Sequence, residues 1–126
     1  LSSSSAASDV YKRQIILRYF NVAGVEKKFR CGFDIQRGQN LILKLCEASI
    51  KNRTFMINGN NYKTSDGTTI RDYIHVEDLA KIHLLIAKIL FKNRTFKVFN
   101  CGYGYGFSVK QILDQFSLAS KKKSEI

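Results

Sequence analysis

Short apolar runs separated by polar turns predict that the first half of the chain alternates strands with a helix. Residues 15–20, IILRYF, form a β-branched and aromatic run that predicts a mostly buried strand. Asn40 precedes apolar residues spaced along one face, at positions 41, 45 and 48, which is typical of a capped helix. Residues 54–57, TFMI, predict a second strand, closed by the turn residues at 58–61.

The second half continues the alternation with a turn at 65–67, a strand over 73–76 and a long amphipathic helix over 77–92. The apolar face of that helix comprises Leu79, Ile82, Leu85, Ile86, Ile89 and Leu90. Residues 96–99 predict another strand, and Ser108 is placed to cap a last helix. Inward positions of that helix are Val109, Ile112, Leu113 and Phe116. The order β-α-β-β-α-β-α predicts an α/β protein with short connections.

Composition limits the class of protein. The chain has 126 residues, 44% of them hydrophobic, which suits one packed domain and excludes a wholly disordered chain. Three cysteines without C-x-x-C spacing argue against a disulfide scaffold and favour a reduced compartment, so we expect a cytoplasmic protein. No apolar run approaches the ~20 residues that cross a bilayer, so no membrane partner is expected.

The net charge of +11 raises the question of a nucleic-acid partner. The basic residues are scattered, and the one run, at 121–123, stands near the C-terminus. The scatter favours no nucleic-acid partner, but a basic nucleic-acid-binding module stays open as an alternative, which steep salt dependence of DNA binding would support. Residues 1–14, LSSSSAASDVYKRQ, predict a disordered leader or an adapter-like artefact.

Two motifs resemble ligand sites only in part. Residues 102–106, GYGYG, lie between a strand and a helix, but their third glycine comes one position early for a dinucleotide loop, so a plain turn is favoured. Residues of metal-ligand type gather at His75, Glu77, Asp78 and His83 without an H-x-x-x-H pair. We therefore expect no metal, and a histidine hydrogen-bonded at a strand end.

Arg71 is a candidate for a binding residue. It stands beside a turn, followed by Asp72 and a strand, and its planar fork suits a phosphate or a carboxylate. A structural Arg71–Asp72 ion pair is the competing interpretation, and composition alone favours it. No nucleophile elbow, Walker loop or paired-carboxylate spacing is present, so no catalytic residue is predicted.

Residues 66–80, DGTTIRDYIHVEDLA, closely resemble the segment DGTxxRDYIHVxDLA of the UDP-glucose 4-epimerase family, part of the extended short-chain dehydrogenase/reductases. Three further segments are similar in order and spacing: 17–24 (LRYFNVAG), 40–42 (NLI) and 98–109 (VFNCGYGYGFSV). The resemblance covers about residues 15–121. It implies the edge of a Rossmann-type parallel sheet plus most of a smaller α/β substrate-binding lobe.

In this family, tightly held NAD removes hydride from C4 of UDP-glucose or UDP-galactose and returns it to the other face of a 4-keto sugar. The resemblance implies one contact with NAD, from Phe20. It implies seven contacts with the UDP-sugar, from Asn21, Asn40, Leu41, Met56, Ile57, Asn58 and Arg71. Residues 56–58 would line the uracil pocket, Arg71 would clamp the diphosphate, and the full-length enzyme would be a homodimer.

Several family features are missing from this sequence. The glycine-rich cofactor loop and the Ser/Thr with Tyr-x-x-x-Lys catalytic set would precede Ile15, and a late arginine-rich segment would follow Ile126. Asn58 stands where an aromatic residue is common, which argues against stacking on uracil, and Leu43 and Ser65 replace family prolines. We therefore expect a fragment that neither binds NAD tightly nor turns over UDP-galactose alone.

The expected fragment divides unevenly between two domains. Residues 15–25 would end the NAD-binding Rossmann domain, and residues 26–126 would form mainly the substrate-binding lobe, with 70–92 packing back on the Rossmann domain. A nucleotide-sugar dehydratase or reductase of the same family is the alternative enzyme.

Overall fold

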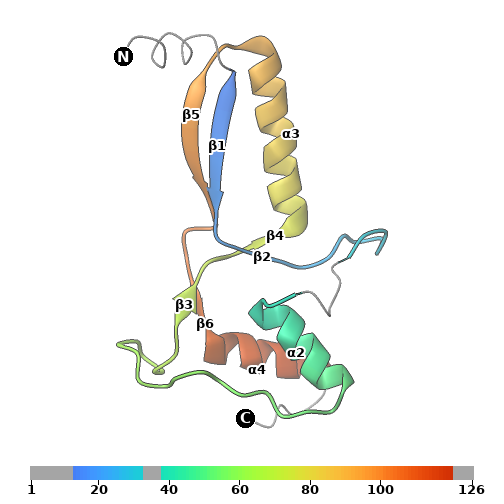
Figure 1. Cartoon of the computed structure of the whole chain (residues 1–126), viewed down its shortest axis with the longest axis vertical. Coiled ribbons are helices and arrows are strands. Elements are labelled where there is room, and N and C mark those ends of the chain that lie inside the picture. The colour runs from blue at the N-terminus through green and yellow to red at the C-terminus, as the bar shows by residue number, and fades with distance from the viewer. Residues whose placement is uncertain (1–12, 33–37, 121–126) are drawn as a thin grey trace, which may run out of the picture.

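The computed structural model describes residues 13–32 and 38–120, and shows a mixed α/β chain (Figure 1). In chain order the elements are β1 (Gln14–Tyr19), β2 (Asn21–Ala23), α2 (Leu41–Ile50), β3 (Ile70–Arg71), β4 (Tyr73–His75), α3 (Val76–Lys92), β5 (Phe96–Cys101), β6 (Phe107–Ser108) and α4 (Val109–Ser120). The predicted α/β class is confirmed. Within the described ranges, every helix is too short or too polar to cross a lipid bilayer.

The strands in the described ranges form three separate pairs. β1 pairs with β5 and β2 with β4, both in parallel, whereas β3 and β6 are antiparallel. In the first pair Tyr19 lies opposite Cys101, so the carboxyl ends of both strands meet at one edge. Ligands of parallel α/β sheets bind beyond such an edge.

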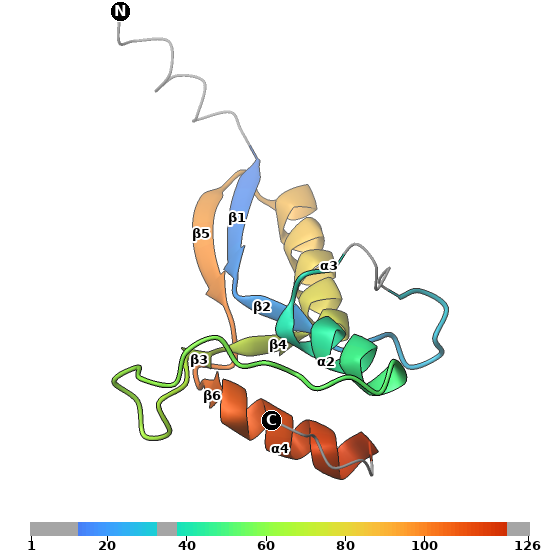
Figure 2. The ribbon, with the colours of Figure 1, turned by 60° about the horizontal axis from the view of Figure 1, so that its bottom comes forward.

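A small core joins α3 to the parallel pairs. Ile74, Leu79 and Cys101 are buried, and they come from β4, α3 and β5 respectively. Half-buried Leu17 of β1 packs against them. Figures 1 and 2 both show α3 running alongside β1 and β5, with α2 and α4 lying together at the other end of the molecule. Burial of these apolar side chains from four elements holds the carboxyl edge of the sheet in place.

The strand predicted over residues 15–20 is confirmed by β1, but the prediction that this strand is mostly buried is wrong. Ile16 is 39% exposed and Tyr19 50% exposed. In the described part of the chain, β1 pairs with β5 alone, and α3 contacts β1. In the same way Leu85 and Ile89 of the predicted apolar helix face are exposed, while Leu79 is buried.

Residues 54–57 are not a strand, and that prediction is wrong. No described segment forms a ladder with them, and without a paired neighbour an apolar run has no sheet to join. Phe55 and Ile57 are half-buried and Met56 is exposed. The predicted cap before α2 is confirmed, because Asn40 Oδ1 accepts a hydrogen bond of 2.9 Å from the Leu43 N–H.

The predicted turn at 65–67 is confirmed, and it needs its glycine. Gly67 has φ +78°, and a Cβ there would lie 2.1 Å from the carbonyl oxygen of Asn60. The turn brings Asp66 to the end of β6, where its carboxylate accepts hydrogen bonds from the hydroxyls of Thr68 and Ser108. Thr68 and Ser108 are both buried, and this carboxylate accepts the hydrogen bonds that their hydroxyls donate.

Candidate nucleotide-binding site

An open pocket of about 230 Å³ lies between the start of α2, the coil that follows α2, and the start of α4. Figure 2 shows that coil running back past α4 toward β3. The pocket is lined by Gln39, Leu41, Lys44, Phe55, Met56, Ile57, Asn58, Gly59, Thr68, Thr69 and Val109. Most of this lining is apolar or neutral, as in pockets that enclose a small organic ligand.

Four of the seven residues expected to contact the UDP-sugar line this pocket. Leu41 comes from α2, and Met56, Ile57 and Asn58 come from the coil fifteen or more residues further on. Asn40 lies next to them but its Oδ1 is already bound to the Leu43 N–H, so its side-chain NH₂ is the group left to donate to a ligand.

A second group of expected contacts lies at the carboxyl edge of β1 and β5. The Asn21 backbone N–H and side-chain Nδ2 donate to the Asp72 carbonyl oxygen, at 3.2 and 3.3 Å. A Cβ at Gly102 would lie 2.4 Å from Asp72 Oδ2 and 3.0 Å from the Phe20 ring, so these three residues are in close proximity. Phe20 is 57% exposed. Phe20 and Asn21 therefore lie together but do not line the pocket.

Arg71 and Asp72 do not form the structural ion pair that composition favoured. Asp72 instead accepts hydrogen bonds from the backbone N–H groups of Tyr103 and Gly104, at 3.3 and 3.0 Å. Backbone amides in a glycine-rich turn offer a carboxylate two aligned donors, and so compete with a flexible arginine. Arg71 is exposed, and it has no ion pair among the residues that the structure describes.

The glycine-rich turn at 102–106 leads into β6 and holds a carboxylate of the same chain. Two amides of this turn are therefore bound within the chain, which favours a plain turn over a dinucleotide loop. Arg71, which forms no ion pair with any described residue, directly precedes the aspartate that fixes this turn.

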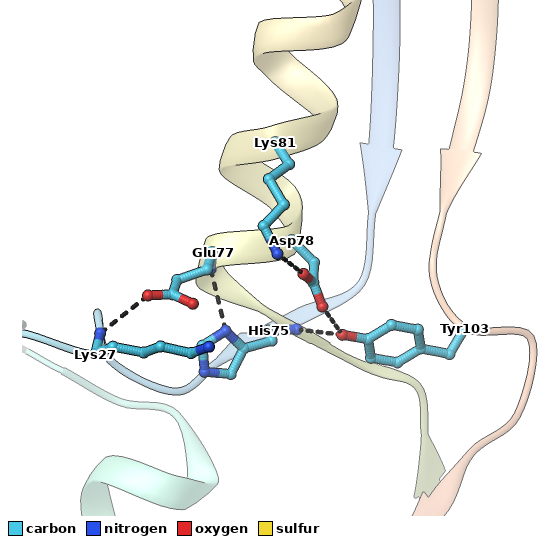
Figure 3. A network of polar contacts seen from close by, with 6 residues as sticks. All are labelled: Lys27, His75, Glu77, Asp78, Lys81 and Tyr103. Carbon is cyan, nitrogen blue, oxygen red and sulfur yellow. Dashed lines mark hydrogen bonds and ion pairs between the residues drawn. The ribbon is translucent and has the colours of Figure 1, made fainter.

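Tyr103 connects that turn to the start of α3 (Figure 3). Its hydroxyl donates to Asp78 Oδ2 at 2.5 Å, and Lys81 Nζ donates to Asp78 Oδ1 at 2.8 Å. The Lys81 ammonium, and next the Tyr103 hydroxyl, lower the pKa of Asp78. The same bond to Asp78 raises the pKa of Tyr103, because it favours the protonated hydroxyl. This contact was not predicted, since nothing in the sequence pairs a turn tyrosine with a helix 25 residues away.

His75 caps α3, as expected for a histidine hydrogen-bonded at a strand end. Its Nδ1 accepts the Glu77 N–H at 3.2 Å, and the Glu77 carboxylate in turn accepts the Lys27 N–H at 2.9 Å (Figure 3). His83 lies further along α3, with Nδ1 2.8 Å from the Leu79 carbonyl. Among the described residues, no group of three or more His, Cys, Asp or Glu side chains is placed to hold a metal ion.

The parallel pair β1–β5, with α3 beside it, is a Rossmann-like α/β arrangement, and proteins of this class bind their ligands beyond the carboxyl ends of the strands. The sequence profile of the NAD dependent epimerase/dehydratase family matches residues 4–102. The chain belongs to that family.

Several relatives are UDP-glucose 4-epimerases. The enzyme of Azospirillum brasilense is 44% identical over 102 residues, which is 80% of this chain and 29% of the relative. The mouse enzyme is 38% identical over 118 residues, 92% of this chain and 34% of the relative. The Bifidobacterium longum enzyme, solved in complex with NAD+ and UDP, superposes with a TM-score of 0.84 at 30% identity, over 94% of this chain and 36% of that one. The chain thus spans about a third of the length of these relatives.

Proposed function

We propose that this chain is part of an NAD-dependent UDP-glucose 4-epimerase, which interconverts UDP-glucose and UDP-galactose through a 4-keto sugar. The observation that carries the proposal is the pocket, where Leu41 of α2 meets Met56, Ile57 and Asn58 of a distant coil. The family resemblance implies that Leu41 helps to hold the uridine diphosphate and that residues 56–58 line the uracil pocket, and all four residues line this one pocket.

The residues of this chain would bind and orient the nucleotide. Ile57 and Leu41 would enclose the uracil ring, and Asn58 offers an amide that can donate and accept at its edge. Arg71, which no internal carboxylate neutralises among the described residues, would take two diphosphate oxygens with its planar fork. Asn21, fixed by its two bonds to the Asp72 carbonyl, would contact the sugar end.

The described residues do not fit NAD by themselves. Phe20 is the one expected cofactor contact, and the amides of the glycine-rich turn are bound to Asp72 instead of being open to a pyrophosphate. We therefore propose no role in hydride transfer for these residues. We propose that residues 15–25 belong to the NAD-binding domain and that 26–126 belong mainly to the substrate lobe, with 70–92 packing back. A homodimeric, cytoplasmic full-length enzyme is proposed on the family resemblance alone.

Segment exchange tests this function. The matching 102-residue segment of the Azospirillum brasilense enzyme is replaced by that of this chain, and epimerisation of UDP-galactose is measured with NAD present. We expect the chimera to epimerise UDP-galactose and the same chimera with Arg71→Ala to lose most of that activity. A folded chimera that binds NAD but does not epimerise UDP-galactose would contradict the proposal, and activity on a different UDP-sugar would favour a dehydratase or reductase of the same family.

A further inference from the structure

Lys44 lines the pocket, although the family resemblance did not mark it as a contact. It lies in α2, four residues after Asn40, so it occupies the same side of the helix as the cap. Of the described residues that line the pocket, Lys44 is the one with a formal charge.

Lys44 has no close anionic partner among the residues that the structure describes. No ion pair or side-chain hydrogen bond of Lys44 is present within residues 13–32 and 38–120. Glu47 lies three residues further along α2, where its carboxylate is bound by Lys51 at 2.6 Å, and Lys44 is the smallest of the causes that lower the pKa of Glu47. Lys44 is exposed to solvent, so its ammonium can meet an incoming ligand without first breaking an internal contact.

We propose that Lys44 recognises the phosphate charge of a nucleotide whose base occupies the pocket. This inference rests on the proposed function, which places a uridine nucleotide there. Half-buried Phe55, Ile57 and Val109 give the pocket walls that suit a flat heterocycle, and they carry no charge of their own. A single cation without an ion pair beside such a pocket favours ligands in which a negatively charged group is attached to a flat apolar ring.

Lys44 and Arg71 would have different tasks. A lysine ammonium acts as a mobile point charge with three donors, whereas a guanidinium binds two oxygens in a fixed plane. Lys44 would therefore raise affinity for phosphate-bearing nucleotides without setting the orientation of the diphosphate.

Binding of UDP and of uridine to the full chain tests the inference, with Lys44→Gln, Lys44→Arg and a matched control, Lys88→Gln. Lys88 is an exposed lysine of α3 that does not line the pocket. Lys44→Gln should weaken UDP binding about tenfold, the effect of losing one charge-assisted contact. Uridine binding should stay the same, Lys44→Arg should keep most of the UDP affinity, and Lys88→Gln should leave both ligands unchanged.

The outcomes separate this inference from the proposed function. If UDP binds and Lys44→Gln weakens it no more than Lys88→Gln, or weakens uridine equally, Lys44 does not recognise phosphate and the inference fails alone. If ADP binds as well as UDP and both depend on Lys44, the phosphate contact is supported while the uridine pocket is refuted. If the wild-type chain binds none of the three ligands, both fail.

Discussion

Neighbouring residues can have opposite tasks, as Arg71 and Asp72 show. Asp72 turns inward to two backbone amides of the glycine-rich turn, and Arg71 remains exposed without an ion pair in the described segments. The carboxylate thus stabilises the fold near the carboxyl edge of β1, which leaves the guanidinium available for a ligand. An adjacent Arg and Asp in a sequence do not by themselves predict a salt bridge.

Arg71→Lys should weaken UDP binding about tenfold, because an ammonium cannot replace the two parallel hydrogen bonds of a guanidinium. The melting temperature should not change, since Arg71 has no internal ion pair among the described residues. Titration calorimetry and a thermal melt measure the two effects. Arg94→Lys, at another exposed arginine, is the control. Equal UDP affinity in both variants would show that Arg71 does not contact the diphosphate.

Asp66 should make stability depend on acid pH. The hydroxyl of Ser108, and next the N–H and hydroxyl of Thr68, hold the pKa of Asp66 below its ordinary value of 3.8. A carboxyl whose pKa is lower in the folded state stabilises the fold above its unfolded pKa, and this stabilisation is lost as the pH falls through the folded value.

Asp66→Asn should therefore lower the urea midpoint at pH 7 and flatten its fall between about pH 5 and pH 2. Asp114→Asn, at an exposed residue of α4 without these contacts, serves as the control. The contribution assigned to Asp66 is wrong if the wild-type and Asp66→Asn curves run parallel over this pH range.

Among the elements, the contact between the glycine-rich turn and α3 is the least predictable from sequence. Lys81 is the largest cause of the lowered pKa of Asp78, and Tyr103 is the second. Lys81→Met should therefore raise the pKa of Asp78 more than Tyr103→Phe does. Carboxyl-carbon NMR titration measures both values. An unchanged pKa in Tyr103→Phe would mean that the turn is not bound to the helix in solution.

The start of α4 is held by a reciprocal cap. Ser108 Oγ accepts the Gln111 N–H at 3.1 Å, and Gln111 Oε1 accepts the Ser108 N–H at 2.9 Å. Ser108→Ala should lower the free energy of unfolding by about 1 to 2 kcal/mol, because it removes a helix cap and leaves the Asp66 carboxylate without one of its hydrogen-bond donors. Urea unfolding measures this cost, and Ser65→Ala at an exposed turn residue should be nearly neutral. A loss as small as that of Ser65→Ala would rule out the cap.

At the scale of the whole molecule, sequence patterns predicted the helices well and the short strands poorly. Each described helix carries a cap residue and an apolar stripe, such as Asn40 with Leu45 or Ser108 with Leu113, and both signals are local. β3 and β6 have two residues each, too few for an alternating pattern. The apolar run at 54–57 has strand composition, but no strand among the described residues pairs with it.

The residues of the candidate site were predicted one by one from the segments that resemble the family. That these residues fall into two separate groups could be seen only in the structure. Leu41 and residues 56–58 meet in a pocket, whereas Phe20 and Asn21 lie at the carboxyl edge of β1. Lys44 was overlooked because a lysine on a helix is ordinarily a solvated residue. The signal that could have found it is its spacing of one helical turn from Asn40.

The central claim is that this chain carries a uridine nucleotide pocket between α2 and the coil after it. Titration of the ¹⁵N-labelled 126-residue chain with UDP, followed by two-dimensional ¹H–¹⁵N NMR, tests it most directly. The account predicts that UDP shifts the amide signals of Leu41, Lys44 and residues 56–58, and that ADP shifts them much less. Absence of shifts at these residues, or equal shifts with ADP, would contradict it.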